Sequence, residues 1–151
     1  MGLDNGVHLI VKEKLDLDDW MIFPEWAKID FDEYSTEHYK DGFYYDICYW
    51  RKCWDLRERI LSVIDGKDLG KSDIDKPSQI DEIIDEIIYF LKNPEEWDRS
   101  IWELDEMIPH LGQDIVNLSW LKKYMADNPT ARAEFYDSYW GKKNDKRSLW
   151  I

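Results

Sequence analysis

The chain has 151 residues, enough for one domain with a substantial core, and 44% of them are hydrophobic, which excludes an intrinsically disordered protein. Its 33 acidic and 20 basic residues give a net charge of −13, a field that repels nucleic acids and anionic membranes. We therefore expect a single domain over residues 1–151 that binds neither nucleic acid nor membrane directly and that suits a partner with a basic surface. The composition leaves the oligomeric state open.

A small β-hairpin is predicted near the N-terminus. Residues 7–12 are mainly apolar and β-branched and follow the turn residues Asp4-Asn5-Gly6, which indicates a strand. A second apolar run, residues 20–23, stops at Pro24 and is the expected partner strand. The N-terminus lacks the basic and apolar regions of a signal peptide, and no apolar stretch approaches the length of a membrane span.

The segment from residue 13 to residue 46 is strongly acidic. It holds eleven acidic and three basic side chains, and aromatic residues are spread among them without a helical or strand period. Acid pairs here are similar to calcium loops but lack the glycine and glutamate of an EF-hand, so we expect no metal site. The candidate partner-binding carboxylates of this segment are Asp16, Asp18, Asp19, Asp30, Asp32 and Glu33.

Residues 44–64 are predicted to form a central, tryptophan-rich helix that ends at Asp65-Gly66. Its apolar positions form two adjacent stripes, which indicates contacts with more than one neighbour. Cys48 and Cys53 would point apart on such a helix and could not form a disulfide. Two free thiols are typical of a reducing compartment, so we expect a cytoplasmic protein.

Arg57 lies near the same predicted stripe as Trp50 and Trp54, where a leucine would be expected. A buried cation needs an acidic partner, so Arg57 predicts a structural ion pair. The alternative is a ligand pocket in which the two tryptophan rings stack on a base or sugar while Arg51 or Arg57 holds a phosphate.

Two short patches of this sequence resemble small uncharacterised proteins of bacteriophages and prophages. The patches are the start, Met-Gly-Leu-Asp-Asn-Gly (residues 1–6), and the run Tyr-Trp-Arg-Lys-Cys-Trp-Asp-Leu-Arg (residues 49–57). The resemblance implies a phage-encoded protein that acts inside a bacterial cell, and it implies no particular chemistry.

The second half of the chain is predicted to be helical. A loop over residues 65–77 precedes the clearest helix, residues 78–92, whose isoleucines repeat with helical spacing. Further helices are expected from residue 94 to an interruption at Pro109, from there to residue 128, and over residues 131–140. The basic tail, residues 141–151, is expected to fold back on the acidic body. The opposite face of the 78–92 helix supplies four more candidate partner-binding carboxylates: Asp81, Glu82, Asp85 and Glu86.

These elements predict an α+β fold that is predominantly helical, with four to five helices around the tryptophan-rich helix and a small N-terminal β-hairpin. No nucleophile motif or phosphate-binding glycine loop occurs, so we assign no catalytic residue and no cofactor. The function that the sequence favours is an acidic, non-enzymatic interaction protein, such as a phage inhibitor that occupies a basic nucleic-acid-binding surface of a host defence protein. A nucleotide or small-molecule binder and an unrecognised enzyme are the alternatives.

Overall fold

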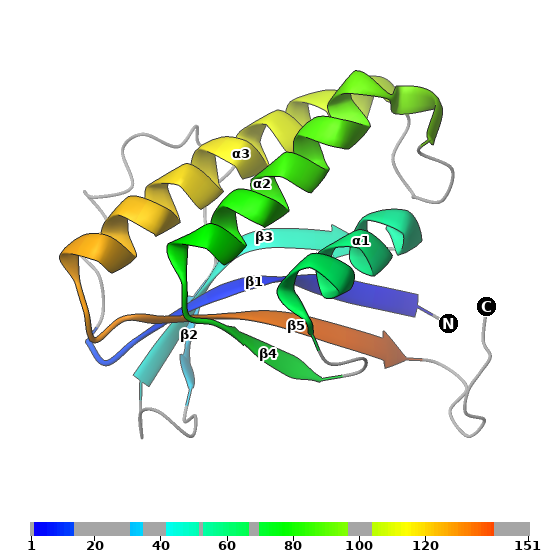
Figure 1. Cartoon of the computed structure of the whole chain (residues 1–151). Helices are drawn as coiled ribbons and strands as arrows, with labels where there is room; N and C mark the ends of the chain where they lie inside the picture. The colour runs from blue at the N-terminus through cyan, green and yellow to red at the C-terminus, as the bar shows by residue number, and fades with distance from the viewer. Residues whose placement is uncertain are drawn as a thin grey trace.

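The computed structural model describes residues 2–13, 31–34, 42–51, 53–66, 70–96 and 104–140 of the chain. These residues form an antiparallel sheet with helices packed on one of its faces (Figure 1). In chain order, the elements are β1 (Gly2–Val11), β2 (Phe31–Tyr34), β3 (Gly42–Arg51), α1 (Trp54–Ile64), β4 (Lys71–Ile74), α2 (Pro77–Lys92), the 3-10 turn η3 (Pro94–Glu96), α3 (Leu104–Asp127) and β5 (Arg132–Trp140).

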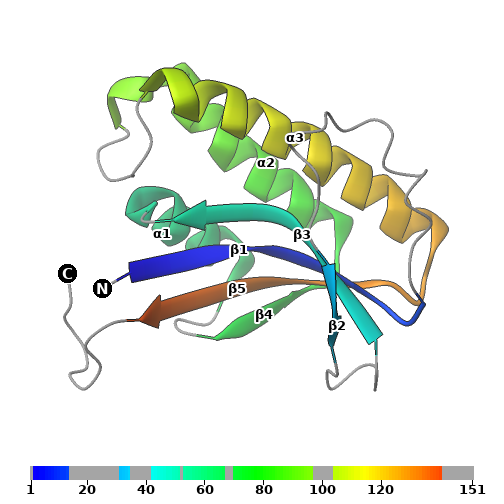
Figure 2. The same ribbon diagram turned by 180° about the vertical axis from the view of Figure 1, so that it is seen from behind.

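The five strands lie in the order β2-β3-β1-β5-β4, and every neighbouring pair is antiparallel. The first strand therefore lies at the centre, and the last strand of the chain pairs with it along nearly its whole length. Seen from behind, α1, α2 and α3 still lie on one side of the sheet (Figure 2). Each strand consequently has an inner face toward the helices and an outer face away from them.

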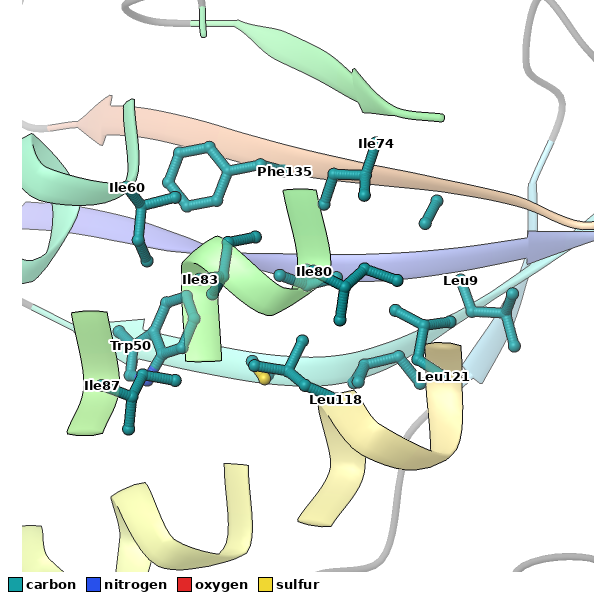
Figure 3. Packing of buried hydrophobic residues seen from close by; sticks show 14 of the residues in the cluster. Leu9, Trp50, Ile60, Ile74, Ile80, Ile83, Ile87, Leu118, Leu121 and Phe135 are labelled. Carbon is teal, nitrogen blue, oxygen red and sulfur yellow. The ribbon is translucent and has the colours of Figure 1, made fainter. Parts of the chain in front are cut away.

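The core lies between the inner face of the sheet and the helices (Figure 3). Val7, Leu9 and Val11 alternate along β1, and α2 contributes a stripe of isoleucines at helical spacing. Burying one such side chain stabilises the fold by about 1.5–3 kcal/mol. Fully buried examples are Leu9, Trp50, Ile60, Ile83, Ile87, Leu118, Leu121 and Phe135.

The predicted arrangement of four to five helices around a tryptophan-rich helix is wrong. The described residues form three α-helices on a five-stranded sheet, and residues 42–51 form the strand β3. Tyr45 and Ile47 are buried while Tyr44 and Asp46 are not, so this segment has the two-residue period of a strand. The tryptophan spacing that indicated a helix spans the junction between β3 and α1.

Three further segments differ from the sequence prediction. Residues 132–140 form β5 where a helix was predicted, and the predicted loop 65–77 contains β4. The helix α3 continues through Pro109, whose missing N–H removes a single hydrogen bond at a solvent-exposed position. The described neighbours of β1 are β3 and β5, and the partner strand predicted over residues 20–23 lies outside the described residues.

Several predictions are confirmed. The helix expected over residues 78–92 is α2, which begins at Pro77, and the strand expected over residues 7–12 is the second half of β1. Helix α1 ends at Asp65, which adopts the left-handed conformation, and Gly66 follows it as predicted. Both cysteines are free thiols. The acidic residues 14–30 and the basic tail 141–151 lie outside the described residues.

Candidate functional site

The centre of the sheet carries a β-bulge. The pairing of β1 with β3 shifts between Val7 and His8, which face Cys48 and Asp46, so Ile47 is the extra residue. A side chain at Gly6 would place its Cβ 2.1 Å from the carbonyl oxygen of Cys48, so this position requires glycine. Bulges commonly occur beside functional sites, where they reorient side chains.

Three polar residues of α3, which we call the polar stripe, hold this bulge. Asp114 accepts a hydrogen bond from the indole Nε1 of Trp50 at 2.8 Å. Nδ2 of Asn117 donates to the carbonyl oxygen of Ile47 at 2.9 Å. The third member, His110, places Nε2 3.2 Å from the carbonyl oxygen of Tyr49. A carbonyl oxygen can only accept, so this nitrogen carries the proton. The polar stripe therefore fixes α3 to the bulged strand.

The buried thiol and carboxyl at the bulge are poorly suited to nucleophilic chemistry. Burial raises the pKa of Asp114 well above its ordinary value, although hydrogen bonds from Trp50 and Cys48 oppose the shift. Burial also raises the pKa of the Cys48 thiol well above its ordinary value, and the charge of Asp114 adds to the effect. A thiol that stays protonated is a weak nucleophile, so Cys48 lacks the activation of a catalytic cysteine.

A second buried polar contact joins α1 to the sheet. Arg57 is 3% exposed, and its Nε and NH2 atoms donate to the two carboxylate oxygens of Asp137 on β5 at 2.8 and 2.9 Å. This is a bidentate arginine–carboxylate contact, a geometry that arginine can form and lysine cannot. The prediction that Arg57 is a buried cation with an acidic partner is confirmed, and the partner lies 80 residues away in the sequence.

The two sequence patches, residues 1–6 and 49–57, meet where β1 pairs with β3. Asn5 pairs with Trp50, and the neighbouring pairs are Asp4 with Arg51 and Gly6 with Tyr49. The hydroxyl of Tyr49 donates to Oδ1 of Asp4 at 2.8 Å. Residues 4–6 of the first patch and 49–51 of the second therefore pair next to the bulge, whereas residues 54–57 belong to α1.

A groove with a volume of about 650 Å³ lies between α1, α2 and η3. Among the described residues, Arg59 and five carboxylates line it. The guanidinium of Arg59 lies 4.0 Å from the ring centre of Tyr89 and contacts Oε1 of Glu86 at 3.1 Å. We call this cavity the acidic groove. Its lining residues are Asp55, Glu58, Arg59, Ser62, Val63, Glu86, Phe90, Glu95 and Glu96.

The structure distributes the predicted partner-binding carboxylates unevenly. Glu86 lines the acidic groove, and Glu82 and Asp85 are exposed on the same helix. Asp81 contacts Nζ of Lys122 at 2.9 Å. Asp32 and Glu33 lie on β2 and their side chains are not described, while Asp16, Asp18, Asp19 and Asp30 lie outside the described residues.

The groove acids outside α2 were not among the predicted carboxylates. Asp55 and Glu58 come from the first turns of α1, and Glu95 and Glu96 come from η3. In the sequence these residues form two short acidic groups about 40 residues apart. No local sequence pattern indicates that α1 and η3 approach each other.

The residues of the alternative pocket do not form one open cavity. Trp50 is fully buried and Arg57 is occupied by Asp137, while Arg51 ends β3 and Trp54 begins α1, both half-buried. Within the described residues, no group of three or more histidine, cysteine or acidic side chains is placed to hold a metal ion. Over the same residues, no helix has the length and apolar character needed to cross a membrane.

Comparisons with models of protein families, with curated proteins and with solved structures find no match to this chain.

Proposed function

We propose that the protein is an acidic, non-enzymatic interaction protein that binds a basic surface of a partner. In the form that the phage resemblance suggests, it is made by a phage, acts in the bacterial cytoplasm and occupies the nucleic-acid-binding surface of a host defence protein. The net charge of −13 supports this proposal, because such a field attracts cationic surfaces and speeds their association.

The acidic groove is the observation that carries the proposal. Five of the described lining residues are carboxylates, and the described lining cation, Arg59, already contacts Glu86. Carboxylates gathered along a concave surface repel one another, and lysine or arginine side chains of a partner would relieve that repulsion. Val63, which is partly exposed, gives the groove apolar contact area that bulk counterions cannot use. The groove therefore suits a basic side chain with an aliphatic stem.

The burial of the tryptophan and arginine side chains favours this function over a nucleotide pocket. A stacking pocket needs open rings beside a guanidinium that is free to bind phosphate. Here Trp50 is fully buried and its indole N–H donates to Asp114. The Nε and NH2 atoms of Arg57 both donate to Asp137. These side chains support the scaffold beneath the acidic surface.

A pull-down from a bacterial lysate tests the proposal. We expect the tagged protein to capture a DNA- or RNA-binding protein at low salt and to release it at about 0.5 M salt, where the Debye length falls well below its physiological value of ~8 Å. Added duplex DNA should compete for the captured protein. Capture that persists at high salt, or that DNA does not reduce, would contradict the proposal.

Two triple variants with equal net charge show whether the groove is responsible. The groove variant carries Glu58→Gln, Glu95→Gln and Glu96→Gln. The control variant removes three exposed acids elsewhere, through Asp65→Asn, Asp75→Asn and Asp127→Asn. The groove variant should lose capture at low salt, and the control variant should retain it. Equal loss in both variants would mean that overall charge, and not the groove, drives binding.

A further inference from the structure

His8 lies on the outer face of the central strand β1, between carboxylates from both neighbouring strands. Its Nε2 is 3.0 Å from Oδ1 of Asp46 on β3, and its Nδ1 is 3.2 Å from Oε2 of Glu134 on β5. The His8 side chain is 13% exposed and that of Glu134 is 7% exposed, so water screens this contact only weakly, whereas Asp46 is 31% exposed and its contact is screened more. The three residues join the three central strands of the sheet.

This geometry favours the protonated form of the ring. A neutral imidazole donates from one nitrogen only, and its other nitrogen presents a lone pair. Nδ1 is within hydrogen-bond geometry of Glu134 and Nε2 is within ion-pair distance of Asp46, so a carboxyl oxygen lies beside each nitrogen and the imidazolium form, with a proton on each nitrogen, suits both contacts.

The other groups around His8 are compatible with a charged ring. Tyr136 stacks on it at a centroid distance of 4.1 Å, and Tyr44 lies tilted at 4.5 Å. Aromatic faces attract cations. The described titratable groups that face the cluster are Asp46 and Tyr44 from β3, Glu134 and Tyr136 from β5, and Lys71 from β4, whose Nζ is 3.7 Å from Oε2 of Glu134.

We propose that His8 is a pH-sensitive link that holds β3, β1 and β5 together while it is protonated and releases one of its two carboxylate contacts when it loses the proton. Burial alone would lower the pKa of His8, but the contacts with Asp46 and Glu134 outweigh it and raise the pKa above its ordinary value of 6.5. The link is therefore complete below pH 6.5 and is lost as the pH rises through the raised value. The bulge of β1 and β3 begins at this residue, so deprotonation loosens the sheet next to the bulge.

Nitrogen NMR of the histidine rings tests this proposal directly. At pH 6.5 we expect both ring nitrogens of His8 to be protonated, and the titration midpoint should lie above 6.5. Asp46→Asn and Glu134→Gln should each move the midpoint downward, measured on the folded protein. A midpoint at or below 6.5, or a ring with one unprotonated nitrogen at pH 6.5, would overturn the proposal.

Unfolding in urea provides a second readout with a matched control. Above pH 6.5, the folded state holds one more proton than the unfolded state, so the folding constant of the wild type should fall by up to about tenfold per pH unit until His8 has titrated. His8→Gln should reduce this slope by the contribution of His8, and the slope that remains comes from the buried carboxyl of Asp114, whose raised pKa acts in the same direction. His110→Gln should leave it unchanged, because burial lowers the pKa of His110 and its titration lies below this window. An unchanged slope in His8→Gln would contradict the proposed link.

Discussion

The Arg57 and Asp137 pair and the acidic groove contain the same kinds of side chain in opposite settings. In the pair, both residues are buried and each carboxylate oxygen of Asp137 accepts a hydrogen bond from Arg57. In the groove, five carboxylates line the molecular surface, where Glu86 contacts Arg59 and Glu58 contacts Arg57. The charges of the buried pair are enclosed within the fold, whereas the carboxylates of the groove lie where a partner can reach them.

This difference assigns separate roles to the two regions. A buried ion pair is costly to break because its remaining member is left without a partner, so the pair specifies how α1 sits on the sheet. Surface charges contribute little to stability, and they influence association instead. Variants of the pair should therefore change stability, and variants of the groove should change binding.

The largest expected effect comes from Asp137→Ala. This change leaves the guanidinium of Arg57 buried without its main partner, and we expect a loss of about 3–5 kcal/mol in the free energy of unfolding. Urea unfolding followed by tryptophan fluorescence measures the loss. Glu58→Gln is the control, because Glu58 contacts the same arginine but is exposed, and it should cost less than about 1 kcal/mol. Similar losses in both variants would contradict the comparison.

Two glycine substitutions test the bulge. Gly6→Ala brings a methyl group against the backbone of Cys48 and should cost about 1–3 kcal/mol. Gly112→Ala adds the same group to α3 where no atom lies within 4 Å, and it should stabilise the helix by up to about 1 kcal/mol. Thermal unfolding compares the two variants. A Gly6→Ala protein as stable as the wild type would show that the bulge is not as tight as described.

The buried carboxyl of the polar stripe should produce its own pH dependence. Because burial raises the pKa of Asp114, the folded state holds its proton where the unfolded state has lost it, and stability falls as the pH rises from about 4 through the raised value. Asp114→Asn retains an oxygen that can accept from Trp50 but cannot ionise. The stability of the variant relative to the wild type should therefore increase with pH, measured by urea unfolding between pH 4 and 8. A constant difference across this range would contradict the raised pKa.

The smallest effect on stability is expected for the groove. Glu95→Gln and Glu96→Gln should each change the free energy of unfolding by less than about 0.5 kcal/mol, because both side chains are exposed. Urea unfolding of the single variants checks this value. A loss of several kcal/mol would mean that these residues maintain the fold and do not serve binding.

The sequence could predict those parts of the fold whose signal is local. The isoleucine spacing of α2 and the left-handed end of α1 at Asp65 are of this kind, and so is the need of Arg57 for an acidic partner. The identity of that partner, Asp137, depends on pairing β5 with β1, which no local pattern indicates.

Residues 44–51 show why strong local signals can mislead. Trp50 and Trp54 have helical spacing, yet Tyr45 and Ile47 are buried while Tyr44 and Asp46 are only partly buried, as in a strand. Pairing with β1 decides between these patterns, because it buries the inner side chains and pairs eight residues of β3 with β1. The acidic groove was missed for the same reason, since α1 and η3 contribute acids that meet only in the folded chain.

The most direct test of the account is the salt dependence of binding to the captured partner, measured for the wild type, the groove variant and the control variant. We expect the groove variant to bind about tenfold more weakly at low salt, or roughly 0.5 kcal/mol per removed charge, with a flatter dependence on salt. The control variant should bind almost as the wild type does. If the two variants lose affinity equally, the acidic groove is not the binding site and the proposed role of this surface is wrong.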